Sequence, residues 1–184
     1  MRLLNVVFLL CLAAPCGSAG VVLSINPAVA SVLSGSDVTL SVDISGVSDL
    51  YAWQFDLTFD PAILQVQSQT EGDFLSSAGP TFFISGFLDT GSITNIADAL
   101  EGSGPGADGS GTLLNLNLLG LGIGTSALSV SNVFLLDSLG NDIPFTSSDS
   151  AITITPEPES LWLVVPGAPL AWWRNRKLSV DDGK

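Results

Sequence analysis

The chain has 184 residues, which is enough for one ordinary domain. A hydrophobic fraction of 46% and a charged fraction of 12% exclude a chain that is disordered throughout. The formal net charge is −13, and residues 20–155 contain 14 Asp or Glu but no Lys or Arg. This excludes nucleic acid as a partner, because no cation is present there to neutralise phosphate.

Histidine and cysteine are missing from the middle of the chain. The sequence has no histidine, and both cysteines, Cys11 and Cys16, lie within the first 19 residues. Thiolate nucleophiles, zinc sites of the usual ligand set and histidine-based acid–base catalysis are therefore excluded from residues 20–155. A glycoside hydrolase would have to use two carboxyl groups, and no cluster of aromatic residues supports such a site. We expect a protein that is not an enzyme.

The first 19 residues are typical of a secretory signal peptide. Arg2 provides a positive start, Leu3–Ala14 is a largely apolar run of 12 residues, and Gly17–Ala19 supplies the small residues that signal peptidase prefers. A membrane anchor is the alternative, but a helix of 12 residues is about 18 Å long against about 30 Å of hydrocarbon. We expect export and removal of residues 1–19 by signal peptidase.

Strict alternation of apolar and polar residues predicts two strands after the leader. The even positions are apolar in Val38–Ser45, and the odd positions, from Tyr51 to Phe59, are apolar in Tyr51–Asp60. Trp53 is in phase with Phe55 and is expected in the core, so that the domain offers no exposed aromatic residue.

Shorter apolar segments predict further strands, which are separated by turns rich in Gly, Pro, Asn and Asp. These strands are expected at Val21–Asn26, Leu64–Gln67, Thr81–Ser85, Ser92–Ala97, Thr112–Leu119, Ala127–Val130, Val133–Leu136 and Ala151–Thr155. No long helical period competes with them. The pattern predicts an all-β domain, an antiparallel β-sandwich with jelly-roll topology.

One glycine-rich loop is a candidate calcium site. Asp98, Glu101 and Asp108 place three carboxylates in it, and hard cations prefer several oxygen ligands. Their spacing is not that of an EF-hand loop, and a solvated turn without a metal is the alternative. No other cofactor is expected.

The chain changes character at Pro156. The segment Leu161–Trp173 carries no charge, which predicts a short apolar helix and transient membrane contact, and a basic stretch follows it. A buried core segment is the alternative for these 13 residues. This order resembles the PEP-CTERM sorting signal of bacterial surface proteins, which an exosortase processes. The resemblance rests on Pro156, Glu157, Pro158, Arg174, Arg176 and Lys177.

Four segments of the middle resemble the cohesin family. Ser34–Leu40 is similar to its Gly-Asp turn into a Val-rich strand, Tyr51–Leu64 to its aromatic strand ending in Asp-Pro, Gly109–Leu114 to its Gly-rich entry into a late strand, and Ser131–Ile143 to its closing pattern. The resemblance implies a β-sandwich related to carbohydrate-binding modules. It also implies a non-catalytic role in which one sheet face binds a dockerin-type protein.

The polar faces of the predicted strands supply a candidate binding face. It consists of Asp43, Gln54, Asp56, Thr58, Gln65 and Gln67. Such a face suits a dockerin helix or a polysaccharide, although half-buried strands are polar on the wet side in any case.

These observations divide the chain into a signal peptide (1–19), a cohesin-like sandwich (20–155) and a sorting segment (156–184). We expect an exported binding module of the cell surface or extracellular matrix. The alternative is an acidic structural protein of the matrix or biofilm without a specific ligand.

Overall fold

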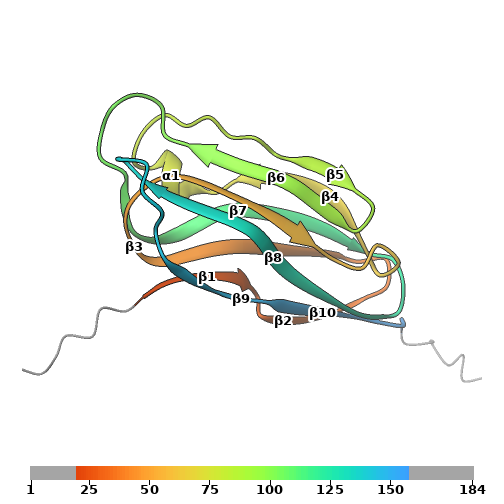
Figure 1. Ribbon diagram of the computed structural model, residues 1–184. Coiled ribbons are helices and arrows are strands. Elements are labelled where there is room, and N and C mark those ends of the chain that lie inside the picture. Colours follow the sequence, from red (N-terminus) through yellow and green to blue (C-terminus); the bar gives the residue numbers. More distant parts are fainter. Residues whose placement is uncertain (1–19, 158–184) are drawn as a thin grey trace, which may run out of the picture.

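The computed structural model describes residues 20–157, which form ten strands and one short helix (Figure 1). The strands are β1 (Val21–Asn26), β2 (Val29–Leu33), β3 (Asp37–Thr58), β4 (Leu64–Glu71), β5 (Phe87–Asp89), β6 (Ser92–Ala99), β7 (Ala107–Gly120), β8 (Gly124–Asp137), β9 (Phe145–Ser148) and β10 (Ser150–Thr155), and the helix α1 is Asp73–Ser76.

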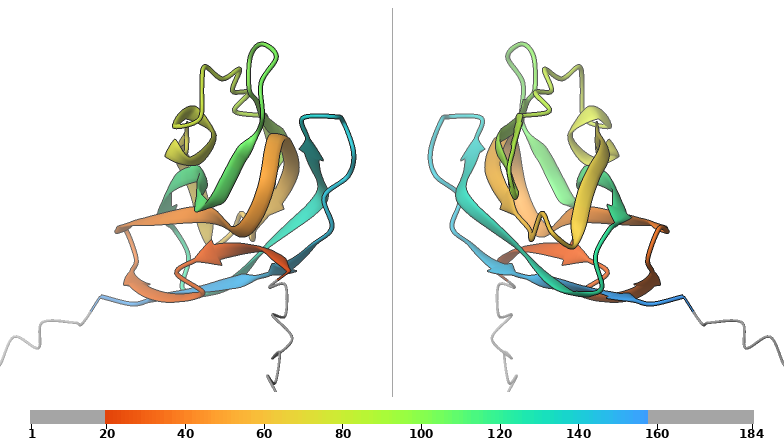
Figure 2. Two further views of the ribbon diagram at one scale, coloured as in Figure 1. Left: turned by 90° about the vertical axis from the view of Figure 1, so that its left-hand side faces the viewer. Right: turned by 90° about the vertical axis from the view of Figure 1, so that its right-hand side faces the viewer.

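The long strand β3 belongs to both layers of the fold. Its first half pairs with β1 on one side and β7 on the other, while its second half pairs with β6 and β8. The first layer therefore has the order β9-β1-β3-β7-β4, and the second has the order β2-β10-β8-β3-β6-β5. Figure 2 shows the two layers from the ends of the molecule.

The bend in β3 explains why two predicted strands are one. The register with β7 shifts twice between Ile44 and Leu50, and both Gly46 and Asp49 have positive φ there, at 70° and 60°. A residue with positive φ turns a strand out of its plane. The alternation in the sequence is interrupted at this bend, although the chain stays in one strand.

Most pairings are antiparallel, as predicted, but two are parallel. β1 pairs with β9 and β2 pairs with β10 in this way. Parallel neighbours need a long connection. Each of these pairs joins a strand near the beginning of the described chain to a strand near its end. The predicted antiparallel sandwich is therefore corrected at these two pairs, β1 with β9 and β2 with β10.

The alternating side chains of both layers meet in one core. Its largest fully buried members come from β1, β3, β4, β6 and α1, and they include Trp53 and Phe55, whose rings stack with their centroids 4.9 Å apart. The prediction that Trp53 lies in the core is confirmed. Because Trp53, Phe55 and Leu57 are buried in this core, the residues between them on β3 face outward.

Three strands and the helix are missing from the sequence prediction. They are β2, β5, β9 and α1, and the predicted strand at Thr81–Ser85 has only isolated bridges, at Thr81 and Ile84. All three residues of β5 are exposed, so its sequence carries no alternation. β2 escapes the pattern because its outward residues Val29 and Leu33 are apolar too.

The described chain begins and ends at opposite ends of the molecule (Figure 1). Within residues 20–157, no helix is long and apolar enough to cross a membrane. The predicted signal peptide and the predicted apolar helix at Leu161–Trp173 lie outside the described residues.

Candidate binding site

The outer face of the second layer has a floor of small side chains. Trp53 and Phe55 of β3 point into the core, so Ala52 and Gln54 point outward. Ala52 pairs with Ala99 of β6 and with Leu136 of β8, and Gln54 pairs with Ala97 and Phe134 in the same way. Three alanines therefore lie together at the centre of the sheet, where the surface is low.

Large apolar side chains form walls on both sides of this floor. Phe134 and Leu136 of β8 form one wall, and Phe82 and Ile84 form the other. The backbone N–H groups of Phe82 and Ile84 donate to Ala99 and Ala97, each at 2.8 Å, which fixes that wall against β6. Phe82 is 62% exposed and Phe134 is 54% exposed. We call this site, with a volume of about 300 Å³, the apolar groove; it is lined by Ala52, Trp53, Gln54, Phe82, Ile84, Ala97, Asp98, Ala99, Phe134 and Leu136.

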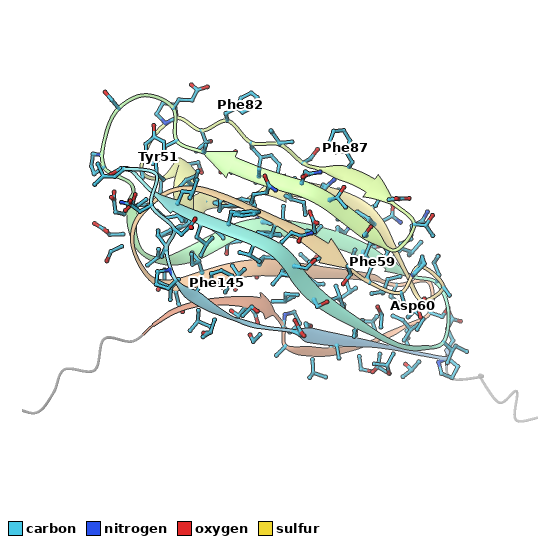
Figure 3. All side chains as sticks on the ribbon, in the orientation of Figure 1. Tyr51, Phe59, Asp60, Phe82, Phe87 and Phe145 are labelled. Atoms are coloured by element: carbon cyan, nitrogen blue, oxygen red, sulfur yellow. The ribbon has the colours of Figure 1, made fainter. Side chains whose placement is uncertain are left out.

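Exposed phenylalanines correct the expectation that the domain has no exposed aromatic residue. Phe87 of β5 is 70% exposed, and Figure 3 shows it on the same side of the molecule as Phe82. One signal for this face was present in the sequence. Val133–Leu136 is apolar at four consecutive positions, whereas a strand with a wet outer face alternates.

A polar network lies on the same face as the groove. Asp56 accepts hydrogen bonds from the backbone N–H of Asn95 at 2.7 Å and from the side chain of Asn132 at 2.6 Å. Both asparagines have positive φ, at 56° and 50°, which Asn tolerates better than most residues. The pairing of β3 shifts in register beside each of them. Asp56 therefore stabilises two irregular positions.

The predicted binding face is divided between the two layers. Gln54, Asp56 and Thr58 lie on the second half of β3, and Thr58 contacts Ser129 of β8 at 2.8 Å. Asp43 lies on the first half, where it accepts hydrogen bonds from Thr112 and Ser41. Gln65 and Gln67 belong to β4, at the edge of the first layer. Of the six residues, Gln54 alone lines the apolar groove.

The structure does not bring together the three carboxylates of the candidate calcium site. Asp98 points into the core and is 2% exposed, whereas Glu101 and Asp108 are exposed. Asp108 accepts a hydrogen bond from the backbone of Asp49 at 2.8 Å. In the described part of the chain, no three acidic, histidine or cysteine side chains form a group suited to a metal. The loop spacing in the sequence did not reveal that β6 turns Asp98 inward.

Asp98 is also the titratable residue whose environment is most unusual. Burial, followed by the negative charge of the neighbouring Glu71, raises the pKa of Asp98 to about 7. Among the described residues neither oxygen of its carboxyl group has a well-aligned hydrogen-bond donor, although the Ala99 N–H opposes the rise in part, and the indole N–H of its cross-strand partner Trp53 has no acceptor. These groups lie directly beneath the groove floor, because Asp98 is between Ala97 and Ala99.

Two other carboxylates organise the loops at one end of the sandwich. Asp49 accepts hydrogen bonds from the Ser138 hydroxyl at 2.7 Å and from the Gly106 N–H at 2.5 Å, and these bonds lower its pKa. The side chain and the backbone of Asn141 lower the pKa of Asp137 in the same way.

The arrangement suits binding of an apolar surface. Exposed phenylalanines around a floor of alanines remove water from apolar atoms when a complementary side chain or helix enters. Residues 20–157 contain 15 acidic and no basic residues, so the field around the groove attracts cations.

Comparison with known proteins identifies the fold. The family model described as a cohesin domain matches residues 23–154. None of the curated proteins compared with the chain matches it.

Several solved structures share this fold. The solution structure of CaCohA2 from Clostridium acetobutylicum has a TM-score of 0.62 and 23% identity, covering 75% of this chain and 92% of that one. A non-cellulosomal cohesin from the archaeon Archaeoglobus fulgidus has a TM-score of 0.62 and 18% identity, covering 74% and 92%. The sixth cohesin of scaffoldin B from Acetivibrio cellulolyticus, solved in complex with a mutant Cel5 dockerin, has a TM-score of 0.62 and 20% identity, covering 74% and 100%. With a family model that matches most of its length, the chain belongs to the cohesin family.

Proposed function

We propose that this domain captures a dockerin-type module through the apolar groove. Cohesin domains are non-catalytic binding modules, and the observation that carries the assignment to this face is its row of exposed apolar side chains. Phe82, Phe87 and Phe134 are each more than half exposed. Side chains of this size are costly to leave in water unless a partner covers them.

The partner fits best if it presents an apolar helix face with basic residues around it. The alanine floor lets a helix approach closely, while Phe82 and Phe134 flank its side chains. The 15 uncompensated carboxylates of residues 20–157 favour a cationic partner and accelerate association at low salt. Asp56, on the same face, is one carboxylate that such a partner meets.

We further propose that the domain acts outside the cell. A leader at residues 1–19 supports export, and the sequence from Pro156 to Lys177 supports sorting by an exosortase. Pro156 and Glu157 are exposed at the end of the described chain, and Pro158, Arg174, Arg176 and Lys177 lie outside it. Figure 3 shows Phe82 and Phe87 along the upper side of the molecule, whereas the described chain begins and ends at the two ends of its lower side.

A polysaccharide is the second candidate ligand. The three exposed phenylalanines favour it, since flat aromatic rings are suited to apolar sugar faces.

The test is a binding screen with the full chain against dockerin modules and a glycan array. Phe82→Ala and Phe134→Ala are compared with Ile123→Ala, which changes an equally exposed apolar residue in the turn between β7 and β8. We expect saturable binding to a dockerin that both groove variants weaken at least about tenfold, equivalent to about 1.4 kcal/mol, while Ile123→Ala has no effect. Binding that the groove variants do not change would place the site elsewhere. Binding to glycans alone would favour the second candidate, and no saturable binding would favour a structural role.

A further inference from the structure

The carboxyl group of Asp98 is buried in an environment that strongly disfavours its ionised form. It is buried beneath the groove floor and 2% exposed, and neither oxygen has a well-aligned hydrogen-bond donor among the described residues; the backbone N–H of Ala99 opposes the rise of its pKa only in part. Burying an ionised carboxylate without partners costs several kcal/mol, and such groups take up a proton instead. Asp98 is the strand residue between the outward-facing Ala97 and Ala99, so its carboxyl group lies on the core side of β6.

Glu71 is the acidic neighbour of Asp98. It comes from β4 in the other layer, it accepts a hydrogen bond from Thr81, which bridges to Leu100 two residues after Asp98, and its negative charge contributes to the raised pKa of Asp98. Two carboxylates are both acceptors, so no bond joins them unless one carries a proton. A protonated Asp98 donates its O–H to Glu71, which gives a partner to the buried group. Glu71 also lines a polar pocket of about 380 Å³, through which water can reach the pair.

The groups around the pair supply no compensating positive charge. β3 contributes the uncharged Trp53, the segment before β5 contributes the uncharged Thr81, and α1 carries Asp73, which is exposed. The described residues contain no Lys or Arg at all. A proton is therefore the one cation that the domain itself can use at this position.

The pair is connected to one wall of the groove. The Thr81 hydroxyl donates to Glu71 at 2.7 Å, and Thr81 begins the segment that carries Phe82 and Ile84. Phe83, between them, packs against the ring of Trp53 with centroids 6.3 Å apart. We propose that Asp98 and Glu71 share one proton and that this proton holds the Thr81–Ile84 wall of the apolar groove in place.

The direction of the effect follows from the position of the pair. Burial and the charge of Glu71 raise the pKa of Asp98 to about 7, far above its value of about 4 in an unfolded chain. The shared proton is present under mildly acidic conditions and is lost as the pH rises through about 7. The carboxylates of buried Asp98 and half-buried Glu71 then repel each other, water enters, and the contact between Glu71 and Thr81 weakens. The Thr81–Ile84 wall is therefore more firmly held below about pH 7 and more mobile above it.

The first experiment needs no partner. Carboxyl carbon chemical shifts of the full chain are followed by NMR from about pH 5 to about pH 8, a range free of histidine titration here, together with hydrogen exchange of the Phe82 and Ile84 amides. We expect one proton to leave the pair with a midpoint of about 7 and the protection of both amides, corrected for intrinsic exchange, to fall with it. The Ala151 amide, bonded to Ala28 far from the pair, serves as the internal control.

Two variants identify the group that titrates. Asp98→Asn keeps a donor toward Glu71 without a titrating proton, so the amides of Phe82 and Ile84 remain protected above pH about 7. Asp149→Asn makes the same change at an exposed position and should behave as the wild type. If Asp98→Asn does not fold, Glu71→Gln replaces it: this variant removes the like charge, so the midpoint falls well below about 7. The proposal would be overturned if the carboxyl chemical shifts of the pair did not change between about pH 5 and about pH 8. It would also be overturned if they changed while the exchange protection of the Phe82 and Ile84 amides stayed constant.

The second experiment rests on the proposed function and uses a dockerin identified by the binding screen. Wild-type affinity should fall several-fold between about pH 6 and about pH 8, and Asp98→Asn should keep its affinity. If no dockerin binds at any pH, the proposed function fails while the result for the shared proton stands. If a dockerin binds equally at both pH values although the pair titrates, the coupling between proton and groove is refuted.

Discussion

The carboxylate of Asp56 on β3 lies 2.6 Å from the side-chain nitrogen of Asn132 on β8. Its other oxygen accepts the backbone N–H of Asn95 on β6 at 2.7 Å. One side chain thus joins three adjacent strands at the point where the pairings on both sides of β3 shift in register. The outer face of the second layer keeps its shape through this contact as well as through the core beneath it.

Replacing Asp56 with alanine should therefore cost more stability than its partial exposure suggests. Hydrogen bonds to a charged group contribute about 1.5–3 kcal/mol each at most, and both partners are residues with positive φ that lose their acceptor together. We expect Asp56→Ala to lower the free energy of unfolding by about 2 kcal/mol, measured by urea denaturation. Asp149→Ala, at an exposed position, should stay within about 0.5 kcal/mol of the wild type. Equal effects of the two substitutions would show that the network contributes nothing.

Acid should loosen one end of the domain. The bonds from Ser138 and Gly106 lower the pKa of Asp49, and those from Asn141 lower the pKa of Asp137. A folded-state pKa below the unfolded value of about 4 means that the stabilisation is present above that value and is lost as the pH falls through the folded pKa. Hydrogen exchange of the Gly106 and Ser138 amides should accelerate, relative to intrinsic rates, when the pH is lowered below about 4.

The control for this effect is a substitution that keeps the shape of the side chain. Asp49→Asn has no charge to lose, so the two amides should be less protected at neutral pH and should show no additional loss in acid. Asp142→Asn, at an exposed position in the neighbouring turn, should retain the acid response of the wild type. An acid response that persists in Asp49→Asn would mean that another group carries it.

The core of this fold is readable from the sequence because its strands bury one face. In Tyr51–Phe59 every second residue is large and apolar, and the structure buries Trp53, Phe55 and Leu57 accordingly. Where the outer face is apolar as well, as in β2, or where no residue is buried, as in β5, the alternation disappears and the strand is missed. The signal is burial on one face, so strands without it leave no pattern.

The groove required knowledge of the strand order. Its floor comes from β3 and β6 and its walls from β8 and from the segment before β5, and only pairing places Phe134 opposite Gln54. The alternation in the sequence indicates the polar residues of the outward faces but not the apolar ones, since an isolated Phe82 or Phe134 resembles a core residue. The burial of Asp98 could not be predicted either. The sequence around this single acidic residue is compatible both with an exposed loop and with the end of a strand such as β6.

The distribution of charge gives a prediction that holds even for the unfolded chain. Between Arg2 and Arg174 there is no Lys or Arg, so trypsin has no site there. In urea, trypsin should leave one large fragment spanning residues 3–174, measured by mass spectrometry. A glutamate-specific protease is the control, since it should cut after Glu71 and Glu101 under the same conditions. Tryptic cleavage within the fragment would contradict the charge map.

Gly72, between β4 and α1, tests how closely the polar edge of the first layer is packed. A Cβ atom at this position would lie 2.0 Å from the backbone oxygen of Thr112 on β7, and the Gly72 N–H donates to Leu113 of the same strand at 2.9 Å. Because the obstacle is backbone, no side-chain rotation relieves it. We expect Gly72→Ala to lower the free energy of unfolding by about 3 kcal/mol and to displace α1 from β7.

Gly104→Ala is the matched control, since nothing lies within 4 Å of its added Cβ, and it should leave the urea midpoint nearly unchanged. Similar midpoints for the two variants would mean that the backbone of β7 gives way easily beside Gly72.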